Sequence, residues 1–166
     1  MTHFQNSRKD KFISSIPIVS LENESNDLTN RSKFNFSYFD EFQNAGQKFE
    51  DWDHKQLVKL LNKLREYSRN SLQYWSNQKI GSGEHRWNVF EVYGSFPKKS
   101  KFVFPKHVPH QAMWARFRLE NSVRLVGFIV PEEYHKKEHS KTKEYFDKNT
   151  FYVVFFDQYH SFYLKR

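Results

Sequence analysis

The chain has 166 residues, which fits one domain on the usual scale of about 100–200 residues per domain. Its 27 Lys and Arg residues outnumber 19 Asp and Glu residues, so the formal charge is +8 and a polyanionic partner is favoured. The lack of cysteine excludes disulfide frameworks, thiolate metal sites and cysteine nucleophiles. No apolar run approaches the roughly 18 residues of a membrane span, and residues 1–10 lack the pattern of a targeting segment. We therefore expect a soluble, cytoplasmic protein without a membrane partner.

Residues 1–32 mix Ser, Asn and charges of both signs around one apolar segment at 12–21. This composition buries little apolar surface, so it predicts a flexible N-terminal arm. The apolar segment either docks on a partner or folds back onto its own domain. Residues 33–166 are predicted to form a single α+β domain.

The first half of that domain predicts a strand and a helix. Aromatic and polar residues alternate over 33–38, which is typical of a short strand. Asp53 followed three residues later by Gln56 predicts a capped helix start. Apolar residues then recur at helical spacing over about 53–77, with a break expected near 68–71.

The second half predicts antiparallel strands, a tendency favoured by an aromatic content of 19%. Residues 87–93 alternate loosely, and segments 114–119 and 123–130 flank a polar turn typical of a hairpin. Residues 132–149 form a charged insertion, which is either a partly helical lid or a surface loop. Segment 151–156 is continuously apolar, as in a central strand. The predicted fold is an N-terminal strand and a helix or helical pair on a curved antiparallel sheet of about three to five strands.

One loop concentrates positive charge, because no acidic residue occurs in the 28 positions between Glu91 and Glu120. Four aromatic residues are interleaved with it: Phe96, Phe102, Phe104 and Trp114. Basic and aromatic side chains together bind single-stranded RNA through phosphate contacts and base stacking, although a plain basic surface with buried anchors has the same composition. The expected RNA-binding residues are Lys98, Lys99, Lys101, Lys106, His107, His110 and Arg116, with Lys165 and Arg166 after the final strand.

A second group of functional side chains surrounds the predicted hairpin. Arg116 and Arg118 are two residues apart and project from one face of a strand, and the turn brings Arg124 opposite that strand. His160 and Tyr163 follow the apolar strand. Metal-free RNA cleavage needs a base, cations that stabilise the phosphorane and an acid, and these groups can supply all three.

The candidate catalytic residues are therefore His160, Arg118, Arg124 and Tyr163, with no metal and no cofactor. Each also has a structural interpretation: His160 and Tyr163 can be packing residues, and the two arginines can be an exposed cross-strand pair.

The histidines carry further alternatives. His107 or His110 could transfer the proton in place of His160, since each has an imidazole that titrates near neutral pH. Asp157 either orients His160 or forms a turn.

The C-terminal part of the sequence resembles the C-terminal half of RelE/ParE-superfamily toxins. The resemblance lies in the stretch 116–128, the apolar strand at 151–156 and the following His160 and Tyr163. The order of elements over about 34–166 is similar to that fold, although Ser161 stands where the family often has Arg, the His-to-Tyr spacing is shorter and 132–149 is inserted. The resemblance implies a RelE-like endoribonuclease, a hydrolase acting on mRNA, often on the ribosome. It also implies a toxin–antitoxin or phage-defence system with a cognate antitoxin. Two alternatives stay open: a non-enzymatic RNA- or ribosome-binding module, and a ParE-like inhibitor of a partner enzyme, as ParE-type members inhibit DNA gyrase.

Overall fold

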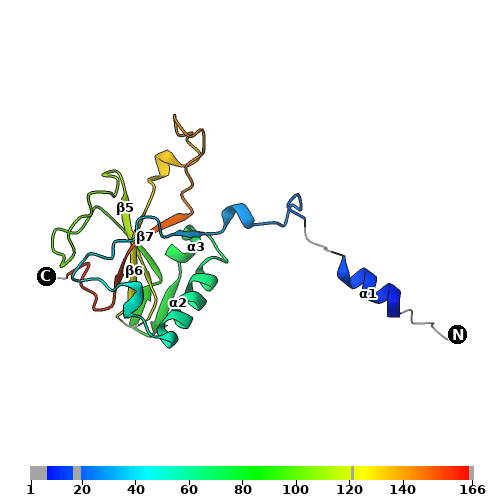
Figure 1. Ribbon diagram of the computed structural model, residues 1–166, viewed down its shortest axis with the longest axis horizontal. Helices are drawn as coiled ribbons and strands as arrows, with labels where there is room; N and C mark the ends of the chain where they lie inside the picture. The colour runs from blue at the N-terminus through cyan, green and yellow to red at the C-terminus, as the bar shows by residue number, and fades with distance from the viewer. Residues whose placement is uncertain (1–6, 17–19, 121, 165–166) are drawn as a thin grey trace.

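The computed structural model describes residues 7–16, 20–120 and 122–164 of the chain. These residues form a mixed α+β structure with a five-stranded sheet and a separate two-stranded ribbon (Figure 1). The helices and strands in chain order are α1 Ser7–Ser15, η1 Leu28–Asn30, β1 Lys33–Asn35, η2 Phe49–Asp51, α2 His54–Tyr67, α3 Leu72–Ser76, β2 Lys79–Ser82, β3 His85–Asn88, β4 Phe90–Gly94, β5 Met113–Arg118, β6 Arg124–Ile129, η3 Glu132–Tyr134 and β7 Thr150–Asp157, where η denotes a short 3-10 helix.

The helical pair is confirmed, and local hydrogen bonds explain its ends. The backbone amide of Gln56 donates to the Asp53 carboxylate at 2.8 Å, and the amide of Asp53 donates to the Gln56 side chain at 3.0 Å. This reciprocal capping box starts α2. After the predicted break, Ser71 accepts the amide of Tyr74 at 3.1 Å and starts α3.

The sheet has the strand order β1-β7-β6-β5-β4, with β1 parallel to β7 and the other neighbours antiparallel. The continuous apolar segment forms β7 between β1 and β6, so the prediction of a central strand is confirmed. The first strand is shorter than predicted: the side chain of Asn35 accepts the amide of Ser37 at 2.8 Å, which bends the chain after β1.

The predicted strand at 87–93 is wrong in detail, because the structure divides it between β3 and β4. β3 turns back on β2, a strand that the sequence analysis did not predict, around Gly81 and Gly83. Both glycines have positive φ, +105° and +58°, a backbone region that suits glycine. The two strands form a ribbon outside the main sheet.

Each face of the sheet buries its own core. One face packs on the helices through Leu60, Tyr67, Leu72, Trp75, Phe117, Leu125 and Phe151. The other face is covered by loops and buries Phe102, Val108, Trp114, Phe128, Val154, Phe155 and Phe162. Because side chains alternate along a strand, Arg116 and Arg118 lie on the same face of β5 as Trp114. This second face of the sheet therefore carries aromatic side chains at one end of β5 and arginines at the other.

Two segments extend from this body. α1 lies well apart from the sheet in Figure 1, and its Phe12 side chain is 68% exposed. Residues 17–19 of the apolar arm segment lie outside the described residues. The insertion at 132–149 is a projecting loop with η3 at its base and an isolated bridge between Glu138 and Tyr145. No described helix has both the length and the apolar character needed to cross a membrane.

Candidate functional site

All four candidate catalytic residues line one cavity of about 630 Å³: His160, Arg118, Arg124 and Tyr163. The β2–β3 ribbon, strands β4 to β6 and the turn after β7 contribute its walls. This volume lies within the range of roughly 300–1,000 Å³ typical of small-ligand sites. Arg116, expected among the RNA-binding residues, also lines it.

Three arginines are buried in the wall of this cavity. The exposed fractions of Arg116, Arg118 and Arg124 are 6%, 8% and 3%. Arg118 and Arg124 are direct cross-strand partners in the β5–β6 register, a placement in which like charges repel. The predicted pairing is confirmed, but the pair is buried and not exposed. Burying cations so close together is costly, and an anion bound in the cavity would offset part of that cost.

Arg116 is held by three groups around the cavity. It forms an ion pair with Glu91, donates from Nε to the Tyr93 hydroxyl at 2.9 Å and donates from Nη1 to the Asn88 carbonyl at 3.3 Å. Burial raises the pKa of Tyr93 and keeps this phenol neutral. The guanidinium is therefore oriented before any ligand binds.

Arg124 and Arg118 are held differently. Nη1 of Arg124 donates to the carbonyls of Glu120 and Val123, both at 2.9 Å. Burial, followed by repulsion from the two other arginines, lowers the pKa of Arg124 to about 10, so the group stays charged at neutral pH. Burial and Arg116 also lower the pKa of Arg118, whose guanidinium lies 5.1 Å over the Trp87 ring. In both shifts burial is the main cause, and repulsion from a neighbouring arginine adds to it; three guanidiniums this close together can attract a phosphate.

A tight turn after β7 brings His160 to the cavity. The carboxylate of Asp157 accepts the amides of Ser161 at 2.8 Å and Phe162 at 2.9 Å, so Asp157 forms the turn, one of its two predicted roles. His160 has φ +55°, an uncommon conformation for a residue with a side chain. Burial, then the charge of Arg124, lowers the pKa of His160, which favours the neutral imidazole that can accept a proton.

Tyr163 forms the other side of the cavity. Its ring stacks on Tyr93 with centroids 4.9 Å apart and an interplanar angle of 7°, and it remains 43% exposed. Its hydroxyl can donate a hydrogen bond to a ligand. Tyr93 and Tyr163 also line a neighbouring groove of about 670 Å³, whose far side carries Lys98 and Lys99.

Sequence reasoning missed several groups in the cavity: Lys79, Arg86, Trp87, Glu91 and Tyr93. Glu91 was recognisable only as the acidic residue that precedes the acid-free stretch. Its role depends on the β4–β5 pairing, which sets it opposite Arg116. The ribbon residues gave no functional signal, because their strands are four residues long and lie outside the main sheet.

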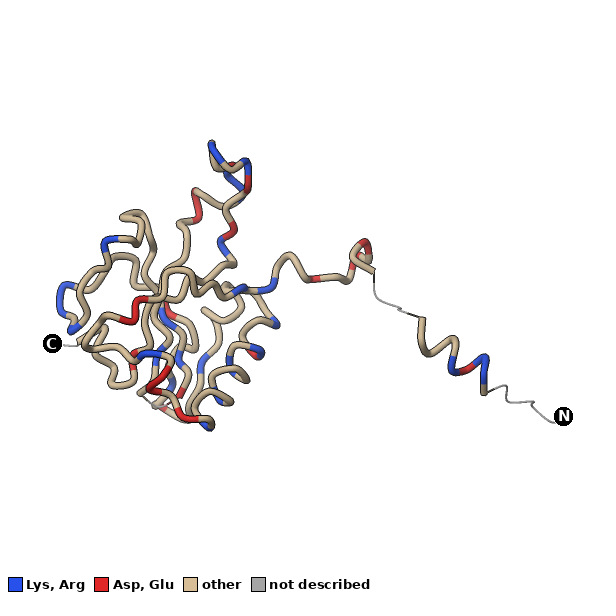
Figure 2. The backbone as a smooth tube through the Cα atoms, viewed as in Figure 1, with Lys and Arg blue, Asp and Glu red and all other residues tan. Residues whose placement is uncertain are grey.

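The remaining predicted RNA-binding residues lie elsewhere. Figure 2 shows Lys and Arg both on the loop between β4 and β5 and within the strands of the sheet. On that loop, Lys101, Lys106, His107 and His110 are exposed and do not line the arginine cavity. His107 instead stacks on Tyr38, with centroids 6.0 Å apart. Lys165 and Arg166 lie outside the described residues.

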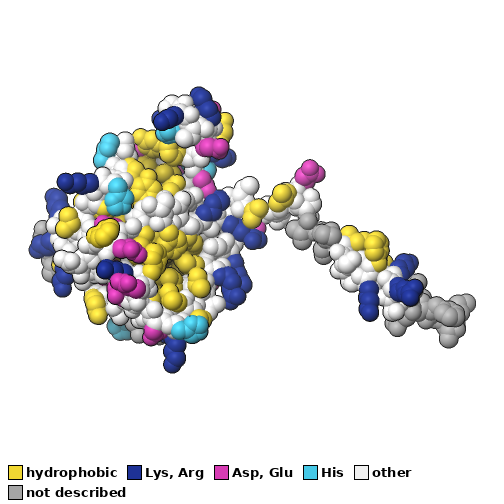
Figure 3. All heavy atoms as spheres, in the orientation of Figure 1, with side chains coloured by type: hydrophobic (Ala, Val, Ile, Leu, Met, Phe, Trp, Pro, Cys, Tyr) yellow, Lys and Arg dark blue, Asp and Glu magenta, His cyan; other side chains and the backbone are white. Residues whose placement is uncertain are grey.

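The expectation that Phe102 and Trp114 stack on bases is wrong. They are 4% and 1% exposed and pack against Phe155 and Phe162. Phe102 anchors the loop on the sheet, because a loop that crosses a sheet face has to bury apolar surface on it. Trp114 belongs to β5, and the loop residues Phe96 and Phe104 pack on its ring. Apolar side chains also gather in a band on the face of the molecule shown in Figure 3, below the projecting insertion.

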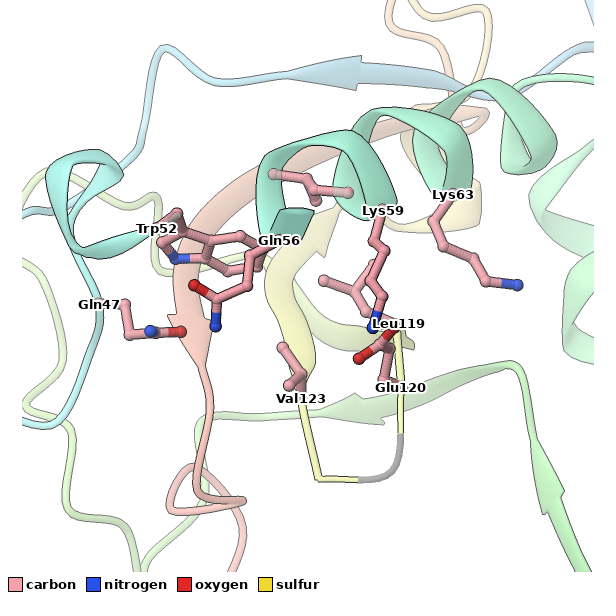
Figure 4. Close-up of a pocket in the computed structure, with 9 residues that line it drawn as sticks. Gln47, Trp52, Gln56, Lys59, Lys63, Leu119, Glu120 and Val123 are labelled. Atoms are coloured by element: carbon pink, nitrogen blue, oxygen red, sulfur yellow. Dashed lines mark ion pairs between the residues drawn. The ribbon is translucent and has the colours of Figure 1, made fainter. Parts of the chain in front are cut away.

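A second hollow lies between α2 and the β5–β6 hairpin (Figure 4). Its volume is about 30 Å³, and the ion pair between Lys59 and Glu120, 2.9 Å long, lies in its wall. The indole nitrogen of Trp52 is buried here without a hydrogen-bond partner among the described residues. A space of this size accommodates water and not a nucleotide.

In the described part of the chain, no three His, Asp or Glu side chains are grouped so that they could hold a metal ion. The cavity brings three arginines together with an imidazole of lowered pKa and two phenols, a set of groups that can bind a phosphate. Searches of protein-family models, curated proteins and solved structures found no match, so the function is inferred from this cavity.

Proposed function

We propose that the chain is a metal-independent endoribonuclease that cleaves single-stranded RNA, as the resemblance to RelE-like mRNA interferases implies. The observation that carries the proposal is the convergence of three buried arginines with a histidine of lowered pKa in one cavity. An anion that enters the cavity relieves the repulsion among the guanidiniums. A phosphodiester of RNA is an anion that carries its own nucleophile, the adjacent 2′-hydroxyl.

The cavity residues divide the cleavage chemistry among them. Neutral His160 takes the proton of the 2′-hydroxyl, whose oxygen then attacks the adjacent phosphorus. Arg116 and Arg124 stabilise the negative charge of the five-coordinate phosphorane through charge-assisted hydrogen bonds. Tyr163 donates a proton to the departing 5′-oxygen. The P–O5′ bond breaks, and the products are a 2′,3′-cyclic phosphate and a free 5′-hydroxyl.

Glu91 acts through Arg116 in this scheme. Its carboxylate fixes the guanidinium on one side, and the Tyr93 hydroxyl fixes it on another. Such fixed dipoles and charges stabilise a transition state without reorganising at the moment of reaction.

The test is cleavage of mRNA, free and on programmed ribosomes, in EDTA at a concentration that spares the ribosomes. We expect wild type to yield 2′,3′-cyclic phosphate ends and His160→Ala to cleave about 100- to 10,000-fold more slowly, as for loss of a proton-transfer group. His107→Ala is the matched control and should cleave like wild type, because His107 lies on the loop outside the cavity. Circular dichroism checks that each variant folds.

The same experiment separates the other functions. Absence of cleavage with salt-dependent RNA binding would leave a non-enzymatic RNA- or ribosome-binding module. Absence of both would leave an inhibitor of a partner enzyme. A toxin role predicts in addition that expression of wild type arrests growth, that His160→Ala does not, and that a cognate antitoxin restores growth.

A further inference from the structure

The β2–β3 ribbon makes few contacts that stabilise it. Its two strands pair only with each other, and all of its residues except Asn88 are exposed. An isolated hairpin of this kind is marginally stable in water. It is fastened at its base, where the amide of Val89 donates to the Gln78 carbonyl at 3.0 Å and Arg116 donates to the Asn88 carbonyl. The ribbon thus forms one wall of the arginine cavity and is positioned partly by the arginines.

Trp87 on this ribbon differs from the three other tryptophans. Trp52, Trp75 and Trp114 are 9%, 8% and 1% exposed, whereas Trp87 is 47% exposed and lines the cavity. A large aromatic ring that stays half-exposed inside a strongly charged cavity adds little to the stability of the fold. Such an exposed ring is typical of a ligand-binding surface.

Two planar groups lie next to the Trp87 ring. The Arg118 guanidinium lies 5.1 Å over its ring, and the His85 ring lies 22° from parallel with its centroid 6.1 Å away. Gly81 makes room for the indole, because a Cβ there would lie 3.1 Å from the ring and 1.9 Å from the His85 carbonyl oxygen. Flat guanidinium and aromatic groups of this kind are the surfaces on which unpaired nucleobases stack.

We propose that Trp87 is the stacking platform of a nucleobase subsite within the arginine cavity. The proposal rests on the proposed function and identifies the ligand unit as a nucleotide of single-stranded RNA. Its phosphate binds Arg116 and Arg124, and its base lies on the exposed part of the indole. The cavity of about 630 Å³ has room for both parts. Because every base has a flat face, the subsite accepts all four bases, and a sugar phosphate that has no base binds more weakly.

The experiment compares three ligands for the full chain by calorimetry: adenosine 3′-monophosphate, ribose 5-phosphate and inorganic phosphate. Stacking on an aromatic side chain contributes about 5- to 150-fold in affinity per base, so wild type should bind the nucleotide more tightly than ribose phosphate by that factor. Trp87→Ala should reduce nucleotide affinity to that of ribose phosphate and leave phosphate affinity unchanged.

Two variants make the result specific to the indole. Trp87→Phe should retain most of the nucleotide affinity but lose the fluorescence change that the nucleotide causes, because the three other tryptophans are buried. Tyr74→Ala is the matched control, since Tyr74 is a 43% exposed aromatic residue on α3 outside the cavity, and it should bind like wild type.

The failures of the two proposals are distinguishable. Equal affinity of wild type for nucleotide and ribose phosphate, or unchanged nucleotide affinity in a folded Trp87→Ala, would overturn the base subsite even if RNA is cleaved. Loss of the base-dependent gain in Trp87→Ala supports the subsite even if wild type cleaves no RNA, which would overturn the proposed function alone.

Discussion

Lys98, Lys99 and Lys101 extend into solvent from the loop between β4 and β5, whereas Arg116, Arg118 and Arg124 are buried at one end of the sheet. The lysines stay hydrated, so their charges hardly lower the stability of the fold. Counting charges along the sequence identifies them easily. The arginines lose water and repel one another, which lowers the pKa of Arg124 and Arg118. The difference teaches that the cost of burying a charge, more than the number of charges in a segment, identifies the candidate anion-binding site.

The largest difference between the two regions should appear in catalysis. We expect Arg124→Ala to slow RNA cleavage by about 100- to 1,000-fold, the usual effect of losing one donor to a developing anion. Arg124→Lys should restore only part of the rate, because lysine lacks the planar fork that can contact both the hairpin carbonyls and a phosphate. Lys99→Ala is the control from the loop and should change the single-turnover rate at saturating RNA only slightly. Equal effects of the two alanine variants would contradict the comparison.

Trp114 of β5, on which the loop residues Phe96 and Phe104 pack, should prove to be structural. Trp114→Ala should lower the free energy of unfolding by about 3–5 kcal/mol in urea denaturation, because it removes a large buried ring. The volume-sparing Trp114→Phe should keep the RNA affinity of wild type. A folded Trp114→Phe that loses RNA affinity would restore the earlier expectation that this ring stacks on bases.

The lysines should act on affinity through salt. Replacing Lys98, Lys99 and Lys101 by Ala should reduce the slope of log affinity against log salt by about 2, at about 0.7 per phosphate contact for single strands. The control removes the same charge from α2 by replacing Lys55, Lys59 and Lys63, where two of the lysines already pair with carboxylates. Equal changes of slope in the two triple variants would mean that only net charge matters.

The smallest expected effect concerns pH. Burial lowers the pKa of His160 below its ordinary value of 6.5, so the acidic limb of the rate profile should have its midpoint below pH 6.5. Between the lowered pKa of folded His160 and the ordinary value of 6.5, the unfolded chain binds more protons than the folded one. The contribution of His160 to the free energy of unfolding therefore falls as the pH falls through this range. His160→Gln should remove this contribution. Titration of the His160 ring by NMR with a midpoint above 6.5 would contradict the lowered pKa of this group.

Local patterns predicted much of the fold. The cap at Asp53, the break before Ser71 and the apolar run of β7 depend on neighbours in sequence, and each is confirmed. The arginine pair could also be predicted from the sequence, because a short hairpin fixes the register that sets Arg118 opposite Arg124.

The rest depended on contacts between distant segments. Glu91 and Tyr93 reach Arg116 only through the β4–β5 pairing, whose register shifts between Val92 and Gly94. Composition also could not say which aromatic rings of the acid-free stretch are buried. Trp114 therefore looked like a stacking surface, and Trp87 drew no attention although it is the exposed one.

The position of β7 inside the sheet, between β1 and β6, has a consequence for biosynthesis. β7 is made after the four strands it joins into one sheet, so β1 has no partner and β6 has an open edge until residues 150–157 have emerged. Pairing of segments so distant in sequence is slow compared with the folding of local hairpins and helices. His160 follows β7 and reaches the arginines only after that strand has inserted. A nascent chain that stops before β7 thus carries the arginines but has no assembled cavity. The complete cavity forms only after β7 has paired with β1 and β6.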